Sequence, residues 1–321
     1  MKKIALCMTA ALGMGLAQAQ VKWDLPTGYG ANSFQTQNVQ QFADEVDKLT
    51  GGKLKITLHP GGSLYKANEI KRAVQTGQVP SAEFILSGAS NENPLFGVDS
   101  IPFLATSYAD SKRLYLAAKP AQEKLLASQG IKVLFSVPWP GQSLYSLKPV
   151  NTPADFAGTK MRAYNPATTR IAQLLKAQPV TIQLSELGQA LATNTVQNFL
   201  TSSASGVESK LYEQVKYFYP VSAWLPRNAT VVNQKAFDAL DKPLQEAVLK
   251  AAAAAEARGW ATSEKLDGEY IKELGAKGMT IAAPSDGVKK VLADIGETMT
   301  AEWLKTAGPE GQAVIDAFRK P

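Results

Sequence analysis

The residue that most clearly offers binding chemistry is Arg162. It ends a short basic strand within the stretch 158–168, which follows a turn marked by Pro and Asp at 152–155 and leads into an apolar-periodic helix. A guanidinium carries five donors in a planar fork, and α/β proteins bind ligands in the crevice beyond the carboxyl ends of their strands. Arg162 is therefore a candidate ligand-binding residue. The alternative is an ordinary surface arginine, because most charged side chains lie at the surface.

The residues needed for most catalytic chemistry are scarce. The sole histidine is His59, and the single cysteine is Cys7. They cannot supply a zinc-type cluster or a Ser/His/Asp triad. Gly28 and Gly30 do not extend into a G-x-G-x-x-G loop, and no G-x-x-x-x-G-K-[ST] sequence occurs. The sequence therefore favours a binding protein without metal or other cofactor over an enzyme. An acid/base pair built from distant carboxylates keeps one alternative open, an exported α/β hydrolase or lyase acting on a small carboxylate.

The N-terminus has the form of a secretory signal. Residues 1–3 are basic, 4–16 are apolar, and Ala-Gln-Ala at 17–19 fits a small-x-small cleavage site. The apolar run is too short to cross a membrane. We expect residues 1–19 to be removed, which leaves 321 − 19 = 302 residues, without cysteine, in the periplasm. Loss of the two lysines lowers the net charge from +6 to +4, and this small excess does not indicate nucleic-acid binding.

The first part of the chain alternates strands with helices. Strands are expected at 21–30, 54–58 and 82–86, and helices at about 33–49 and 67–76. An alternation of this kind is typical of a mostly parallel sheet covered by helices. The fold class is therefore α/β.

Two Pro-rich segments, 137–142 and 224–228, are predicted to cross between two lobes. A long helix follows at about 240–274, and two further helices close the chain. Chains that cross between lobes more than once, with polar loops at strand ends, form hinged clefts that bind ligands. The predicted division is lobe I at 20–141 plus about 229–255, and lobe II at 142–228 plus about 256–321.

Two runs of residues carry a family resemblance. They are Gly158-x-Lys160-x-Arg162-x-x-Asn165 and Ser185-Glu186-x-x-x-Ala190-Leu191-x-Thr193-Asn194-x-Val196. With these runs the sequence resembles the periplasmic solute-binding subunits of TRAP transporters, the DctP-type family. The resemblance covers essentially the whole mature chain in order.

The resemblance implies a two-lobed periplasmic binding protein, type II-like, with hinge strands and a long helix spanning both lobes. It implies that Arg162 binds the ligand carboxylate through two parallel hydrogen bonds, as a guanidinium does well. It further implies a monomer that spans no membrane, performs no catalysis and delivers a small organic acid to a membrane permease driven by an ion gradient.

Three positions depart from the family pattern. Sialic-acid-binding relatives carry a second ligand arginine where this chain has Gln142, and an asparagine where it has Thr201. Many members carry Asp-Gly where this chain has Gln-Asn at 197–198. A second carboxylate would need a second cation, and none is evident. We therefore expect a monocarboxylate.

Further candidates for the ligand site are polar and aromatic residues at strand ends and crossings. They are Asn165, Gln142, Trp139, Tyr164, Thr201, Ser202, Trp224, Asn32, Phe34 and Ser87. The aromatic rings suggest a hydroxylated or aromatic ligand body. For each aromatic residue the alternative is a place in the core, and for Asn165 it is the cap of the following helix. Arg227 could pair with the ligand or with a carboxylate of its own lobe.

Overall fold

The computed structural model describes residues 20–320, so the predicted signal segment lies outside the described residues. The strands are β1 Val21–Pro26, β2 Leu54–His59, β3 Ser81–Ile85, β4 Ile131–Pro138, β5 Ser143–Ser146, β6 Lys160–Ala163, β7 Gln178–Thr181, β8 Asn198–Thr201, β9 Tyr217–Tyr219, β10 Arg227–Asn233 and β11 Thr280–Ile281. The α-helices are α1 Phe34–Thr50, α2 Ile70–Gln75, α3 Tyr108–Ser128, α4 Pro166–Leu174, α5 Leu187–Ala192, α6 Ser203–Glu208, α7 Gln234–Asp238, α8 Lys242–Ala276 and α9 Asp286–Arg319. Short 3-10 helices are η1 Leu86–Ala89, η2 Pro94–Ser100, η3 Pro153–Phe156, η4 Leu184–Glu186 and η5 Leu211–Glu213.

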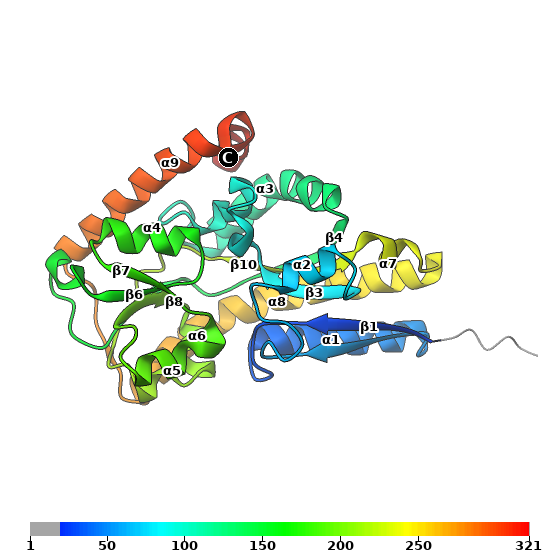
Figure 1. The fold of residues 1–321 in the computed structure, drawn as a ribbon, viewed down its shortest axis with the longest axis horizontal. Coiled ribbons are helices and arrows are strands. Elements are labelled where there is room, and N and C mark those ends of the chain that lie inside the picture. Colours follow the sequence, from blue (N-terminus) through cyan, green and yellow to red (C-terminus); the bar gives the residue numbers. More distant parts are fainter. Residues whose placement is uncertain (1–19, 321) are drawn as a thin grey trace, which may run out of the picture.

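The strands form two groups that define two lobes (Figure 1). In the first lobe β1 pairs with β2 in parallel, and β10 lies antiparallel between β3 and β4. A parallel bridge between Thr27 and Glu83 connects the exit of β1 to β3. The second lobe has the strand order β11-β9-β5-β8-β6-β7, with β6 parallel to both neighbours. The expected parallel pairing thus holds at the start of the chain, while β10 returns from the second lobe and runs against its neighbours.

The two predicted crossings connect these groups of strands and are hydrogen-bonded to each other. The Trp139 backbone N–H donates to the Pro226 carbonyl at 2.8 Å, and the Gln142 N–H donates to the Trp224 carbonyl at 2.8 Å. Between β4 and β5 only residues 139–142 separate the two sheets. Because both connections are short and paired, the lobes share a narrow hinge.

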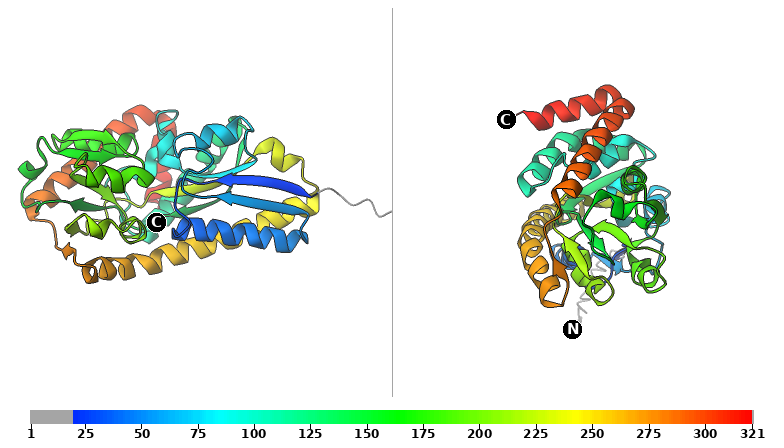
Figure 2. Two further views of the ribbon diagram at one scale, coloured as in Figure 1. Left: turned by 60° about the horizontal axis from the view of Figure 1, so that its bottom comes forward. Right: turned by 90° about the vertical axis from the view of Figure 1, so that its left-hand side faces the viewer.

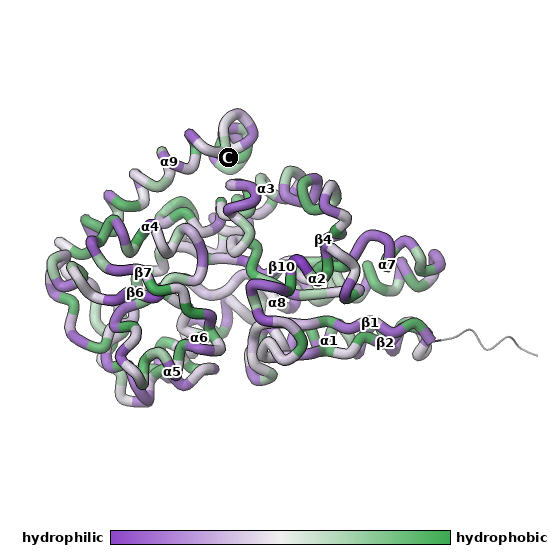
Figure 3. The backbone as a smooth tube through the Cα atoms, in the orientation of Figure 1, coloured by the Kyte–Doolittle hydropathy of each residue, from purple (hydrophilic) through white to green (hydrophobic). Residues whose placement is uncertain are grey.

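The amphipathic helix α1 shows how local sequence builds the first lobe. Its apolar positions Val39, Phe42 and Val46 recur at helical spacing and are buried. The helix ends at Gly51, whose φ of 59° suits a residue without a side chain. Hydrophilic and hydrophobic residues alternate along this helix and along α9 in Figure 3, as expected for helices with one buried face.

The long helix α8 packs against both lobes, as predicted. It contacts α1 and β4 of the first lobe and α6 of the second, and Figure 2 shows it running along the molecule beneath both. Small buried residues at the contact, Ala251, Ala255 and Gly259, allow the backbones to approach closely. The predicted two-lobed α/β fold with a long helix spanning both lobes is therefore confirmed.

The closing segment α9 consists of two helices joined at a kink, in agreement with the two closing helices that were predicted. Gly308, with a φ of 60°, interrupts its helical geometry and is followed by Pro309. Beyond the bend, Val314 and Phe318 pack in one cluster with Leu114 of α3. The exact lobe boundaries given above stay a prediction. Within residues 20–320, none of the helices combines the length and the apolar character that crossing a membrane requires.

Candidate functional site

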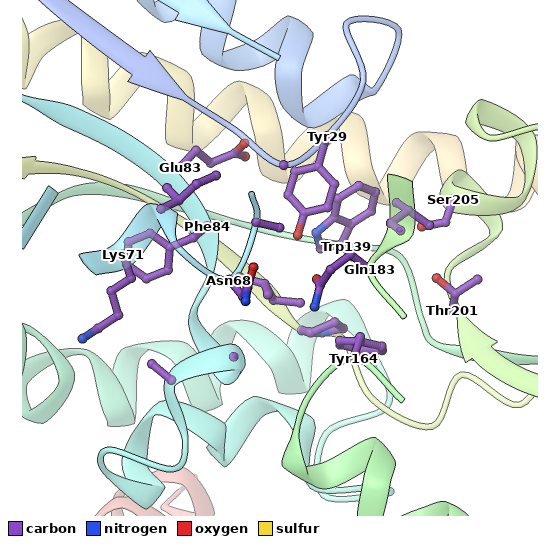
Figure 4. Close-up of a pocket in the computed structure, with 18 of the residues that line it drawn as sticks. Tyr29, Asn68, Lys71, Glu83, Phe84, Trp139, Tyr164, Gln183, Thr201 and Ser205 are labelled. Atoms are coloured by element: carbon purple, nitrogen blue, oxygen red, sulfur yellow. The ribbon is translucent and has the colours of Figure 1, made fainter. Parts of the chain in front are cut away.

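A cavity lies between the two lobes and the crossings. The volume open to the centre of a water molecule is about 170 Å³. A single water needs only about 10–15 Å³, so this cavity has room for several waters or one small organic molecule. Its lining comes from both lobes and from the crossings and includes Tyr29, Lys71, Glu83, Trp139, Gln142, Arg162, Tyr164 and Thr201. Figure 4 shows Tyr29 and Trp139 together in the middle of the pocket, with Glu83 and Lys71 to one side and Thr201 to the other.

Arg162 presents an unpaired positive charge to the cavity. It lies on β6 and is 4% exposed. Its Nε donates to the Ile182 carbonyl at 2.9 Å, and its guanidinium carbon lies 5.0 Å from the Tyr164 ring centroid. None of the ion pairs within residues 20–320 includes Arg162. Burial lowers its pKa to about 10, which leaves the group charged at neutral pH.

A second positive charge at the edge of the cavity is already neutralised. Lys71 on α2 donates to the Glu92 carboxylate at 2.5 Å and to the Gln129 side chain at 2.8 Å. Among the described residues that line the cavity, Lys71 and Arg162 are the only cations. The cavity therefore offers one free positive charge.

Aromatic rings form the wall beside Arg162. The rings of Tyr29 and Trp139 are tilted by 55° with centroids 4.9 Å apart. Tyr164 donates from its hydroxyl to the Gln142 side chain at 3.3 Å, and the Gln142 amide donates to the Pro140 carbonyl at 3.1 Å. Burial raises the pKa of both tyrosines, so they remain neutral donors. Aromatic surface with a few polar atoms beside it suits a small ring-shaped solute.

Glu83 is a cavity residue that the sequence analysis missed. It lies in the middle of β3 and is 1% exposed. Its two oxygens accept hydrogen bonds from the Thr27 hydroxyl and, at 2.9 Å, from the Asn228 side-chain amide. Burial raises its pKa, and these two hydrogen bonds partly oppose that effect. A usable signal was present, namely a single carboxylate inside the otherwise apolar run 82–86.

Five of the predicted site residues line the cavity. They are Trp139, Gln142, Arg162, Tyr164 and Thr201. The other six are placed outside its lining and have contacts elsewhere: Asn165, Ser202, Trp224, Asn32, Phe34 and Ser87.

Asn165 connects the two lobes beside the cavity. Its side-chain oxygen accepts the Thr168 backbone N–H at 2.8 Å. Asn165 therefore caps α4, which was the alternative to a ligand-binding role. Its side-chain nitrogen donates to the Ser87 hydroxyl at 2.9 Å, from α4 in the second lobe to η1 in the first. The two residues therefore contact each other across the cleft.

Asn32 and Phe34 make a second contact between the lobes. The Asn32 side chain donates to the Glu208 carbonyl at 2.7 Å, and the Phe34 backbone N–H donates to the Glu208 carboxylate at 2.8 Å. The Tyr270 hydroxyl lies 3.5 Å from the same carboxylate. Burial raises the pKa of Glu208 to about 7. With contacts on both sides of the cavity, the lobes are held together in this structure.

The remaining candidates serve the second lobe and the hinge. Ser202 caps α6 by accepting the Ser205 backbone N–H at 3.0 Å. Trp224 is 1% exposed and packs in the core of the second lobe. Arg227 pairs with Asp99 at 3.5 Å, so of the two alternatives it takes the carboxylate within the protein.

These features define the class of protein. Two α/β lobes joined by a narrow hinge enclose one small cavity, and a buried, unpaired guanidinium faces it. This is the architecture of a receptor that captures a small organic acid between its lobes.

The chain belongs to the DctP family, described as "Bacterial extracellular solute-binding protein, family 7", whose profile matches residues 27–306. It is thus a TRAP transporter solute-binding protein, as the resemblance implied. Members of this family are extracytoplasmic receptors rather than enzymes.

Three solved structures are close to this one. A Bordetella pertussis receptor binding pyroglutamic acid, DctP6, is 49% identical, covers 94% of this chain and 100% of its own, and gives a TM-score of 0.92. A TRAP solute-binding protein from an unidentified marine microbe, specific for pyroglutamate, is 43% identical with the same coverage and a TM-score of 0.93. A second Bordetella pertussis receptor binding pyroglutamic acid, DctP7, is 40% identical with the same coverage and a TM-score of 0.92.

Proposed function

We propose that this protein captures a small cyclic monocarboxylate, with pyroglutamate as the first candidate, in the periplasm and delivers it to a TRAP membrane permease. The observation that carries the proposal is the single unpaired guanidinium of Arg162 in a cavity whose other cation, Lys71, is bound to Glu92. The ligands of the three similar structures support the choice of pyroglutamate. The protein acts as a monomer and returns its ligand chemically unchanged.

In the proposed mechanism the open protein offers Arg162 to the ligand carboxylate. The two terminal nitrogens of the guanidinium match the two carboxylate oxygens, since Nε is already held by the Ile182 carbonyl. Closure removes water from the cavity and strengthens this attraction. The contacts of Asn165 with Ser87 and of Phe34 with Glu208 form at the same time. The closed form is then the species that the permease recognises.

Titration calorimetry on the chain from residue 20 tests this function. We expect tight binding of pyroglutamate and weak binding of succinate, because a second carboxylate would lack a free cation. Arg162→Ala leaves the carboxylate without its partner, and the general cost of roughly 3–5 kcal/mol predicts a loss of two to three or more decades in affinity. Unchanged affinity in this variant contradicts the role of Arg162. NMR spectra of the ligand after long incubation test for catalysis, and any conversion contradicts a pure binding function.

A further inference from the structure

The Glu83 carboxylate lies in the wall that the first lobe contributes to the cavity. It is almost completely buried, and none of the ion pairs within residues 20–320 includes it. In Figure 4 its oxygens point towards Tyr29, the ring at the middle of the pocket. A buried carboxylate without a cation is costly unless its oxygens accept hydrogen bonds.

The protein groups around Glu83 are fixed as hydrogen-bond donors. The indole N–H of Trp139 can only donate, and it lies 2.9 Å from the Asn228 side-chain oxygen. This contact turns the Asn228 nitrogen towards Glu83, 2.9 Å away. On the other side, Thr27 accepts the Tyr29 backbone N–H at 3.3 Å and directs its hydroxyl proton to Glu83. The network thus prepares Glu83 to accept hydrogen bonds.

The protein leaves part of this acceptor capacity unused. A carboxylate offers about four lone-pair positions, and Thr27 and Asn228 occupy two of them. The residue contributes to the cavity lining, so a bound solute can reach the others. A donor on the solute would then lower the cost of burying the carboxylate.

We propose that Glu83 accepts a hydrogen bond from a ring N–H of the bound acid, so that the site selects cyclic amides over analogues that lack this donor. The inference rests on the proposed function, in which Arg162 holds the carboxylate at the other end of the same molecule. Arg162 selects the charge of the ligand, and Glu83 selects the donor in its ring. The Tyr29 and Trp139 rings provide apolar surface against which the ring of a small cyclic acid can pack.

The direct test compares two ligands that differ at one atom. In 5-oxotetrahydrofuran-2-carboxylate, the lactone matched to pyroglutamate, an oxygen replaces the ring N–H while the carboxylate and carbonyl remain. In the lactone, the ring oxygen would face a Glu83 carboxylate oxygen, and neither atom can donate a hydrogen bond. We expect the wild-type protein to bind it at least about 100-fold more weakly than pyroglutamate. Calorimetry on the wild-type protein alone gives this ratio.

Glu83→Gln should shift the ratio towards the lactone. The Asn228 side-chain nitrogen must donate, so the glutamine has to turn its oxygen towards Asn228. Its N–H₂ group then faces Thr27 and the cavity. An N–H in that place donates to the lactone ring oxygen and opposes the lactam N–H. We expect the preference for pyroglutamate to fall at least tenfold. Glu123→Gln, the same change on an exposed part of α3, is the control and should keep the wild-type ratio.

The possible outcomes separate this inference from the function on which it rests. Failure of the wild-type protein to bind pyroglutamate overturns both. Tight and equal binding of lactam and lactone leaves the carboxylate receptor intact and overturns the role of Glu83. Tighter binding of proline than of pyroglutamate also overturns it, because the donor would then be an ammonium group. A preference for the lactam that Glu83→Gln removes and Glu123→Gln retains supports it.

Discussion

Glu208 should make ligand affinity depend on pH. It accepts a hydrogen bond from the Phe34 backbone across the cleft, and burial raises its pKa to about 7 from an ordinary value of 4.5. In an open form the carboxylate regains water and its pKa returns towards the ordinary value. At a pH between these two pKa values, Glu208 therefore takes up a proton when the lobes close. The contribution to closure is fully present below pH 4.5 and is lost as the pH rises through 7.

The two pKa values set the size of the effect. Their difference of 7 − 4.5 corresponds to a ceiling of roughly 300-fold in the closing equilibrium. The side chain is only partly buried, so solvent screens much of this, and we expect about a tenfold weaker affinity at pH 8 than at pH 5.5. The ligand does not confuse the measurement, since a carboxyl group with a pKa near 3.5 is ionised throughout. Arg162, with a pKa of about 10, stays charged over the same range.

Glu208→Gln isolates this contribution. The glutamine oxygen can still accept the Phe34 N–H, but the side chain does not titrate. Calorimetry with pyroglutamate at four or five pH values between 5.5 and 8 should therefore give a flatter profile in the variant than in the wild-type protein. Parallel profiles would refute the reasoning, because another group would then be responsible for the pH dependence.

Two further variants test the ligand pair and the packing of α8. Arg162→Lys keeps the charge but loses the planar fork, so we expect pyroglutamate affinity to fall about 10- to 100-fold by calorimetry; wild-type affinity would show that only charge matters. Gly259→Ala places a methyl group 2.4 Å from the Val137 side chain and 2.8 Å from Asn38, whereas nothing lies within 4 Å at Gly268 of the same helix. Both changes gain similar helix propensity, so urea denaturation should show Gly259→Ala less stable than Gly268→Ala by about 1–3 kcal/mol. Equal stabilities would contradict the close packing of α8 against β4.

Local pattern in the sequence was enough to predict much of the frame. The apolar spacing of α1 and the length of α8 follow from helical periodicity, and Pro and Gly residues marked both crossings. Arg162 could be named as a candidate ligand-binding residue from its guanidinium group and its place near the end of a strand, without knowledge of its neighbours in space. These features depend on residues close together in the chain, which is why the sequence could indicate them.

Long-range contacts decided which side chains reach the ligand site. Glu83 and Asn228 are 145 positions apart, and their contact exists because β10 returns from the second lobe to pair with β3. Phe34, a predicted site residue, instead meets Glu208 across the cleft. The sequence by itself determined a two-lobed α/β receptor with an arginine at a strand end. Only the tertiary structure decided that a buried carboxylate shares the cavity with that arginine, because hydrogen bonds between distant strands depend on the folded chain and not on local sequence.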